Sequence, residues 1–474
     1  MRVERQQRRA CDRCHAVKEK CRWSDDKTTC ERCHRLRSTC QISRPIATAG
    51  RKSRYHHAIA GARRESRSSS SESSLTASPD GSSNTSNTIA ETTPPPLMHI
   101  STQPSIFTGL NDRELEFLQG IPQGRTRIDQ FLVGPSFRAC HQQTFLRQLC
   151  TATFIIQDAV IASSALIACE DELHTNHQDR AIGHKRAASA ISALRSLGSF
   201  SSGDLSAILM LSASAVTFAL HISGSALAIC RHSLHLIQPF YSPTMDLDTD
   251  SLAFLVCLVH SETAECLLRC EVPTLRFEVP LRYTVDRFLG VAAPLLSHLH
   301  DICEISYNLS RATSVNNAET MRSLDEIGLA VDHWQPSLPN DFMTRFEPAE
   351  VASMLAQANV HRWSILLIAH RLCYPYGTET TKGTALSIAI LTEVDSTVKL
   401  TTRSIPCIDI AYIVACFELT DTRERQLALT KTEVVVEFSR QLQSKIKLLL
   451  IDFWRIRDAR KQLYWYSISS LLLP

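Results

Sequence analysis

The chain has 474 residues, of which 44% are hydrophobic and 21% are charged. This length and composition suit about three domains with apolar cores, and they exclude a wholly disordered chain, a collagen-like repeat and a small disulfide-stapled scaffold. The net charge of +3 conceals an uneven distribution, because residues 1–64 hold 18 Lys and Arg against 6 Asp and Glu while the remainder is acidic. A basic head on an acidic body predicts a polyanionic partner for the head.

Six of the 17 cysteines lie in one short segment, and their spacing repeats. Residues 11–40 read C-x2-C-x6-C, then an eight-residue spacer, then C-x2-C-x6-C again. The six are Cys11, Cys14, Cys21, Cys30, Cys33 and Cys40. Two copies of one half-motif predict a unit with pseudo-twofold symmetry. The other eleven cysteines are scattered among apolar neighbours, which is typical of buried thiols in a reducing compartment.

Cysteine pairs at this spacing predict a zinc site. Two tetrahedral zinc ions need eight ligand positions, and six thiolates supply eight only if two of them bridge both ions. The symmetry-related candidates for bridging are the first cysteines of the two halves, Cys11 and Cys30. Because the segment has very few apolar residues, metal binding must supply its folding free energy, on the order of 10 kcal/mol or more.

Two other interpretations compete with zinc. Residues 11–15 and 30–34 each read C-x-x-C-H, the attachment pattern of c-type haem. Haem attachment leaves Cys21 and Cys40 unexplained, and both haem attachment and a disulfide knot require an oxidising compartment. The first ten residues, MRVERQQRRA, lack the apolar stretch of a secretion signal, so we expect an intracellular protein and a zinc cluster.

In these spacings, and in the basic run Lys18-Glu19-Lys20-Cys21, residues 11–40 resemble the binuclear zinc-cluster transcription factors of fungi. Two features depart from that family. His15 stands where Arg or Lys is common, and the middle loop at 23–29 lacks the usual proline. The first departure affects a phosphate contact and the second the rigidity of the loop, and neither touches a zinc ligand.

The resemblance implies a nuclear, sequence-specific transcription factor of RNA polymerase II genes that binds CGG-type triplets in double-stranded DNA. It also implies control of a metabolic or secondary-metabolite gene set. A short helix over residues 12–20 would enter the major groove. By the same resemblance, Lys18 reaches guanine acceptors, while Arg13 and Lys20 contact the DNA backbone.

Most of the attraction to phosphate is expected from arms on either side of the cluster. Residues 1–10 carry +3 and residues 41–64 carry +6, whereas the cluster with two zinc ions and six thiolates is only about +1. The candidate backbone contacts in the arms are Arg8, Arg9, Arg51, Lys52 and Arg54. Residues 41–64 contain Pro45 and Gly50 and no apolar heptad, so we expect a monomer or a homodimer without an adjacent coiled coil.

The segment 65–104 is expected to be a disordered linker. It holds 12 Ser, 6 Thr and 5 Pro in 40 positions and has no aromatic residue. Such a composition buries too little apolar surface to offset the entropy of ordering the chain.

Residues 105–474 are predicted to form an all-helical regulatory domain. Helical periodicity begins at Asn111, and further segments cover 136–173, 184–197, 252–268, 283–308, 320–334, 351–372, 383–403 and 431–466. The run NVHRWSILLIAHRLCYPYG also resembles the helical regulatory region of the fungal family. The fold class expected for the whole chain is therefore a small binuclear zinc cluster joined by a disordered linker to an all-α regulatory domain.

One apolar segment requires a test for membrane insertion. The 26 residues between Asp204 and Arg231 include no Asp, Glu, Lys or Arg, and they are long enough to span a bilayer. Small polar residues interrupt them, which favours a core helix or a broken helix pair. We therefore expect no membrane partner.

The body contains none of the common catalytic or nucleotide-binding motifs, so we expect no enzyme. Its expected partners are the transcription machinery or coactivators, and a pocket among the helices would be the default site for an effector. Two alternatives remain open: a co-repressor or architectural DNA-binding scaffold, and an enzyme with an appended DNA-binding head.

Overall fold

The computed structural model describes residues 10–12, 14, 21–22, 29–37, 40–41, 109–121, 129–151, 153–170, 177–197, 204–242, 247–280, 285–311, 317–460 and 462–472. The chain divides into two compact units, Met1–Asp80 and Gly81–Pro474, and each is described by itself. The predicted arms and the predicted linker at 65–104 lie almost wholly outside the described residues.

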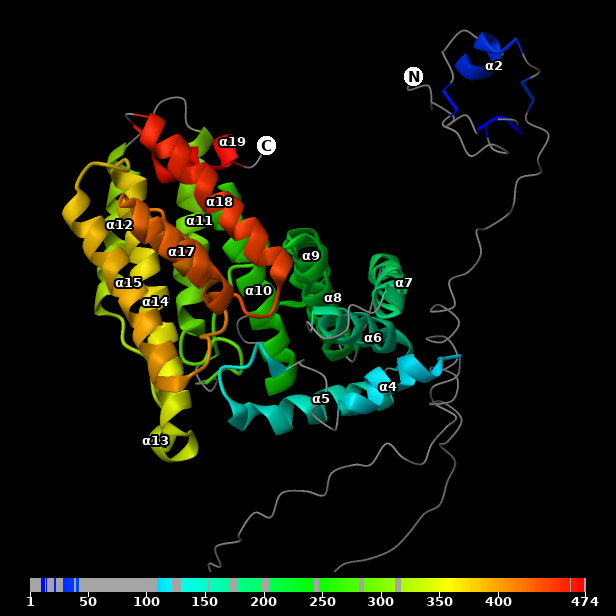
Figure 1. The fold of residues 1–474 in the computed structure, drawn as a ribbon, viewed down its shortest axis with the longest axis horizontal. Coiled ribbons are helices and arrows are strands. Elements are labelled where there is room, and N and C mark those ends of the chain that lie inside the picture. The colour runs from blue at the N-terminus through cyan, green and yellow to red at the C-terminus, as the bar shows by residue number, and fades with distance from the viewer. Residues whose placement is uncertain are drawn as a thin grey trace, which may run out of the picture. The chain divides into compact units, whose positions relative to one another are not determined.

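The second unit is a bundle of packed helices (Figure 1). Over its described ranges it has no strand, and Asp286 and Gly290 form an isolated backbone bridge. Its α-helices are α4 (Asp112–Gly120), α5 (Arg138–Thr151), α6 (Thr153–Glu170), α7 (His177–Ser196), α8 (Leu205–Ser223), α9 (Leu227–Ile237), α10 (Thr249–Arg269), α11 (Leu296–Arg311), α12 (Asn317–His333), α13 (Phe342–Arg345), α14 (Pro348–Cys373), α15 (Thr380–Thr401), α16 (Asp409–Cys416), α17 (Thr422–Val435), α18 (Arg440–Ala459) and α19 (Ser469–Leu472). The prediction of a helical body is confirmed for this part of the chain.

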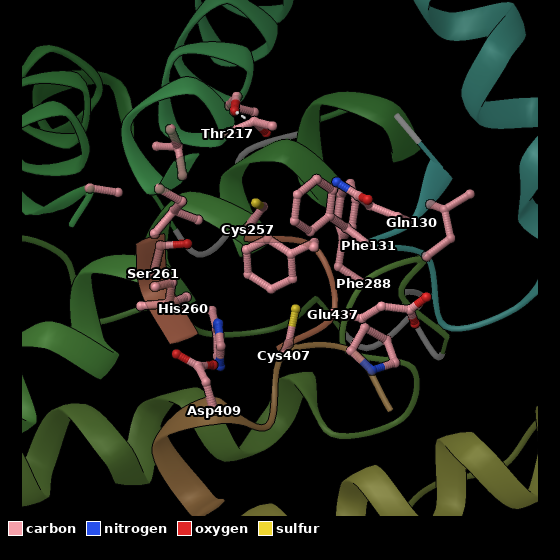
Figure 2. Close-up of a pocket in the computed structure, with 18 of the residues that line it drawn as sticks. Gln130, Phe131, Thr217, Cys257, His260, Ser261, Phe288, Cys407, Asp409 and Glu437 are labelled. Atoms are coloured by element: carbon pink, nitrogen blue, oxygen red, sulfur yellow. Dashed lines mark hydrogen bonds between the residues drawn. The ribbon is translucent and has the colours of Figure 1, made fainter. Parts of the chain in front are cut away.

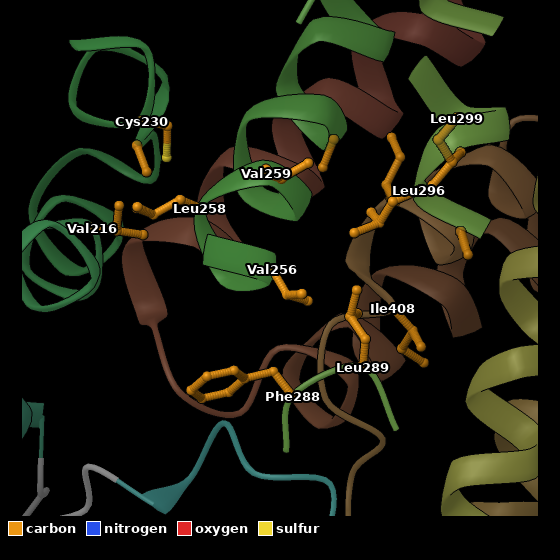
Figure 3. Packing of buried hydrophobic residues seen from close by; sticks show 14 of the residues in the cluster. Val216, Cys230, Val256, Leu258, Val259, Phe288, Leu289, Leu296, Leu299 and Ile408 are labelled. Carbon is orange, nitrogen blue, oxygen red and sulfur yellow. The ribbon is translucent and has the colours of Figure 1, made fainter. Parts of the chain in front are cut away.

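Two helices that are apolar on nearly every side form the centre of the bundle. In α8 every residue from Ala207 to Val216 is buried, and in α10 the same holds from Ser251 to Val256. A helix that is apolar all round must be covered by neighbours. Helix α6 packs on α7 and α8, and α10 packs on α8, α9 and α11. Figure 3 shows Val216, Cys230 and Leu258 from three of these helices within one buried cluster.

A second group of helices packs around α14. Helix α14 contacts α12, α15 and α16, and α17 lies against α18. Pro348 begins α14 at a position where its missing N–H costs nothing, and the side chain of Glu350 caps the start of the helix. Helix α4 begins with a capping box of the same kind between Asn111 and Glu114, where the sequence predicts a helix start.

The long apolar segment between Asp204 and Arg231 is a broken helix pair, one of the two forms that the sequence favours. Gly224 ends α8 in the left-handed conformation, with φ of 61°, and α9 begins three residues later. A side chain at this position would be strained by the backbone, and its Cβ would lie 3.2 Å from the Cα of Leu442.

Three of the predicted helices are wrong in extent. The segment 136–173 is divided between α5 and α6, and a short 3₁₀ helix at Pro135–Phe137 precedes α5. The segment 283–308 is not one helix, because its described residues before Leu296 form a turn and a short 3₁₀ helix that contains Pro294. The segment 431–466 is divided between α17 and α18. Ser439 separates them, since its Oγ accepts a hydrogen bond from the N–H of Leu442 and so begins α18.

Two helices, α8 and α10, are long and apolar enough to cross a membrane when judged by length and composition alone. In each, 72% of the most apolar window is buried inside the helical body. This is the burial expected of central helices in a bundle.

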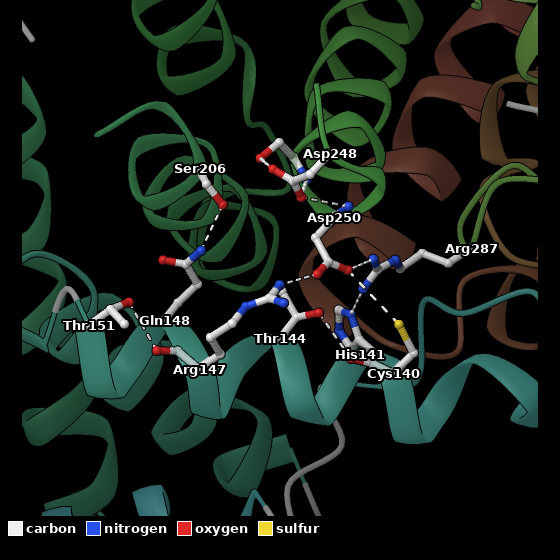
Figure 4. A network of polar contacts seen from close by, with 11 residues as sticks. Cys140, His141, Thr144, Arg147, Gln148, Thr151, Ser206, Asp248, Asp250 and Arg287 are labelled. Carbon is white, nitrogen blue, oxygen red and sulfur yellow. Dashed lines mark hydrogen bonds and ion pairs between the residues drawn. The ribbon is translucent and has the colours of Figure 1, made fainter. Parts of the chain in front are cut away.

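A polar network that runs from the surface into the core joins α5 to the start of α10 (Figure 4). Asp250 forms ion pairs with both Arg147 and Arg287. Arg287 also donates to Nδ1 of His141 over 3.3 Å. Since a guanidinium has only donors, Nδ1 of His141 is the acceptor and the imidazole is neutral.

A second buried ion pair fixes the end of α14. Arg371 is fully buried, and its Nε and Nη2 donate to the carboxylate of Glu418 at 2.6 and 2.7 Å. Gly383 makes room for this pair, because a Cβ there would lie 2.2 Å from Nη2 of Arg371. The bidentate geometry compensates the cost of removing both charges from water.

Replacement of Arg371 by leucine should destabilise the body strongly, because it leaves the carboxylate of Glu418 buried without a partner. We expect a loss of about 3–5 kcal/mol in the free energy of unfolding, measured by urea denaturation. The control is Arg455→Leu, which removes an exposed guanidinium paired with Asp452 and should cost less than about 1 kcal/mol. Equal losses in the free energy of unfolding would show that the buried pair contributes no more to stability than the exposed one.

Two buried histidines meet in the core. The rings of His260 and His361 lie edge to face with centroids 5.5 Å apart, and the side chains are 5% and 2% exposed. Burial lowers the pKa of His361 to about 3 and that of His260 to about 4. Both imidazoles are therefore neutral in the folded protein at neutral pH.

Acid should weaken the fold through these histidines. An unfolded histidine takes up a proton near pH 6.5, whereas folded His361 does so only near pH 3, so the free energy of unfolding falls as the pH drops through this window. The slope is about 1.4 kcal/mol per pH unit for each histidine. His361→Phe should reduce the slope between pH 6 and pH 4, measured by urea denaturation at each pH, and His333→Phe at an exposed position should leave it unchanged. A wild-type slope in the His361 variant would contradict this assignment.

Candidate metal centre

The six cysteines of the first unit bring their sulfur atoms together. Their Sγ atoms form two groups of four, and within each group all four atoms lie within 4.8 Å of one another. One group consists of Cys11, Cys14, Cys21 and Cys30, and the other of Cys11, Cys30, Cys33 and Cys40. Cys11 and Cys30 thus belong to both groups, as the sequence predicts for bridging ligands.

The distances between the sulfur atoms suit a metal ion and not a disulfide. The Sγ of Cys11 lies 3.7 Å from that of Cys30 and 3.6 Å from that of Cys33, and Cys14 lies 3.7 Å from Cys30. Four sulfurs about 2.3 Å from a central zinc ion would be separated by about 3.8 Å. A disulfide would need about 2.0 Å, and all six cysteines are free.

Backbone amides hold the two shared sulfurs in place. Cys30 precedes helix α2 (Glu31–Arg35), and its Sγ accepts a hydrogen bond from the N–H of Cys33 over 3.4 Å. The N–H of Cys14 donates to the Sγ of Cys11 over the same distance. A C-x2-C spacing places the second cysteine where its N–H can cap the first, so the motif itself orients the sulfur.

The pseudo-twofold symmetry that the repeat predicts extends to the backbone. The N–H of Asp12 donates to the carbonyl oxygen of Gln41, and the N–H of Glu31 donates to that of Arg22, both over 2.9 Å. Each of these bonds joins the start of one half to the residue after the last cysteine of the other half. Each half therefore closes the other.

The pKa values of the two shared cysteines are lowered, whereas that of Cys21 is raised. Burial raises the pKa of Cys30, but hydrogen bonds from the Cys33 amide and from neighbouring thiols outweigh it and bring the pKa to about 6. The pKa of Cys11 is also lowered: burial raises it, and the bond from the Cys14 amide acts against burial. Burial raises the pKa of Cys21 to about 12. The thiolate is the form that binds metal, so this donor set fits an ion whose charge would deprotonate the remaining thiols.

The haem interpretation finds no support in this arrangement. The cysteines of both C-x-x-C-H patterns are occupied in the two sulfur groups. His34 is exposed and belongs to neither group, and His15 lies outside the described residues.

The residues predicted to contact DNA lie outside the described residues. They are Lys18, Arg8, Arg9, Arg13, Lys20, Arg51, Lys52 and Arg54. The structure therefore brings together the six predicted metal ligands, and the eight basic positions remain predictions.

Sequence reasoning missed two features of the centre. It did not anticipate the reciprocal bonds from Asp12 and Glu31, or the capping of Cys11 and Cys30 by amide groups. The repeat at an offset of 19 residues was the available signal, since each contact of one half recurs in the other.

The comparisons with known proteins identified no relative of this chain. No model of a protein family matches the chain, and no curated protein or solved structure is significantly similar to it. The fold and the site therefore define a chain with a cysteine centre that can hold metal ions, followed by a helical body.

Proposed function

We propose that the chain is a sequence-specific, DNA-binding transcription factor whose N-terminal cysteine centre holds two zinc ions. The observation that carries the proposal is the pair of four-sulfur groups that share Cys11 and Cys30. Two edge-sharing tetrahedra of sulfur are the arrangement that six thiolates need to complete the coordination of two ions.

Zinc in such a centre would be structural. Four sulfurs around each ion would fill a tetrahedral coordination shell and leave no position for water or substrate, and a closed site of this kind supports folding and not catalysis. The bound ions would supply the positive charge that lets all six thiols ionise in a small volume. The protein's part is to orient the sulfurs through the amides of Cys14 and Cys33.

A charged partner follows from the surroundings of the centre. The excess of basic residues in 1–64 lies on both sides of the cysteines, which suits contact with a polyanion along a groove. The resemblance to the fungal zinc-cluster factors favours duplex DNA with CGG-type triplets and a role in the nucleus. In this reading Lys18 selects guanine, and the flanking Arg and Lys residues bind phosphate.

The helical body would then serve regulation. It contains no catalytic motif that the sequence reveals, and it is large enough to contact the transcription machinery or to bind an effector. A reporter driven by residues 105–474 fused to an unrelated DNA-binding domain separates this role from that of a passive scaffold.

Native mass spectrometry of the full chain should show two zinc ions per molecule. Cys30→Ser removes a ligand from both sulfur groups and should release both ions, whereas Cys40→Ser removes a ligand from one group and should leave one ion. Cys150→Ser, at an exposed cysteine of the body, should retain both.

One zinc ion in the unmodified chain would refute the bridged centre. Equal losses from Cys30→Ser and Cys40→Ser would show that Cys30 is not shared. Chelation should also abolish binding to a CGG-containing duplex in a gel-shift assay, and a chelated chain that still binds would contradict the metal-dependent role.

Lys18→Ala should weaken binding to a CGG-containing duplex by about 1–3 kcal/mol, because it removes a contact to guanine, and should weaken binding to random DNA much less. Fluorescence anisotropy with both duplexes at one salt concentration measures the difference. Arg51→Ala is the matched control, since loss of a phosphate contact should weaken both complexes alike. A uniform loss for Lys18→Ala would reduce that residue to a phosphate contact.

A further inference from the structure

The helical body contains a cavity of about 350 Å³, within the range of small-molecule sites. Residues of α5, α6, α8, α10 and α18 line it, together with the segments around residues 130–132, 402–409 and 435–438. Five phenylalanines line it: Phe131, Phe145, Phe254, Phe288 and Phe438. Figure 2 shows the rings of Phe131 and Phe288 on one side of the view, with His260 and Asp409 on the other.

Among the acidic residues that line the cavity, Asp409 is the one whose carboxyl group faces it without a cationic partner in the described part of the chain. It is the first residue of α16, it lines the cavity, and it forms no ion pair with any residue that the structure describes. Burial raises the pKa of its carboxyl group and outweighs the backbone groups of Asp409 and Ile410, which lower it, while the nearby charge of Glu265 adds a smaller increase. A carboxylate in this position would be stabilised by a positive charge in the cavity.

The other acids of the cavity differ from Asp409 in their surroundings. Glu265 is already engaged, because it accepts bonds from Ser225 Oγ and from the amides of Ala226 and Leu227 at 2.5, 2.6 and 3.0 Å. Glu437 is exposed and accepts a bond from a serine of the same wall. The one arginine of the lining, Arg403, is exposed as well. The acidic group that lacks a cationic partner in the described ranges, Asp409, therefore lies at the inner part of the cavity, and the one arginine of the lining does not compensate it.

His260 supplies a second polar group, in the form of an unpartnered ring nitrogen. Its Nε2 is buried and has no hydrogen-bond partner among the described residues. Burial lowers the pKa of His260 to about 4, so its ring is neutral at pH 7 and one of its two nitrogens carries a lone pair. In the tautomer protonated at Nδ1, Nε2 is the nitrogen that can accept a hydrogen bond from a ligand.

The wall between α15 and α16 is held in an unusual conformation. Thr402 and Cys407 both have positive φ, 56° and 57°, although neither is glycine. Such residues persist where the surrounding structure enforces them, and they cluster at ligand sites. Both line the cavity, and together they bracket the loop that leads to Asp409.

We propose that this cavity binds a small organic amine, with the protonated nitrogen directed to Asp409 and His260 and the apolar part held among the phenylalanine rings. An ammonium group offers only donors, the carboxylate of Asp409 is an acceptor, and Nε2 of His260 is an acceptor in the tautomer protonated at Nδ1. Aromatic faces attract a cation and also accommodate an apolar body. An anionic ligand would meet the carboxylate of Asp409, and a neutral one would leave it unpaired. This site is separate from the cysteine centre and does not depend on DNA binding.

Isothermal titration of the full chain at pH 7 with two matched probes tests the proposal. The probes are 2-naphthylmethylamine, which is protonated, and 2-naphthylmethanol, which has the same shape without the charge. We expect the amine to bind at least about tenfold more tightly than the alcohol, as one partly buried ion pair would give. Equal affinities, or no binding of either probe, would overturn the proposal.

Variants of the chain locate the binding. Asp409→Asn should remove the preference for the amine, and Asp452→Asn, which makes the same charge change on exposed α18, should keep it. Thr217→Phe places a ring in the cavity and should abolish the binding of both probes. Thermal unfolding without probe confirms that each variant folds. A folded Asp409→Asn chain that still prefers the amine, or a folded Thr217→Phe chain that still binds it, would show that the amine binds elsewhere.

Discussion

The N-terminal unit depends on the sharing of two sulfur atoms between two groups of four. Cys11 and Cys30 sit at this junction, and the amides that cap them, together with the bonds that join the two halves, fix their positions. A segment with so few apolar residues gains little free energy of folding from burial of apolar surface. Metal ions bound to the two groups would therefore couple folding of this unit to occupation of the centre.

The helical body is instead stabilised by burial of apolar surface and by buried ion pairs. Helices α8 and α10 bury nearly continuous apolar surface, and the charges that enter the interior are compensated by partners, as Arg371 is by Glu418 and Arg287 by Asp250. Against this background the environment of Asp409 is an exception, because a cavity and not a cation faces it. Unpaired charge in an otherwise compensated core marks the place where a ligand would add most to stability.

The two proposals give the two units separate functions. The cysteine centre would select DNA, and the cavity would bind an amine whose charge completes the interior of the body. Because a ligand that binds only the folded state stabilises it, occupation of the cavity would tighten α16 and the loop before it. That loop, from Thr402 to Cys407, carries the backbone strain of the cavity wall.

The sequence alone determined which six cysteines come together in a centre that can hold metal ions, because their spacing repeats in two equal halves. It also determined the helical class of the body and the start of α4 at Asn111, since periodicity and capping are local properties. The tertiary structure decided what depends on contacts between distant segments. It brought His361 of α14 into contact with His260 of α10. It also placed Asp409, the first residue of α16, in the wall of the cavity without a cationic partner among the described residues. No local pattern encodes these outcomes, because each arises from which helix faces which across the core.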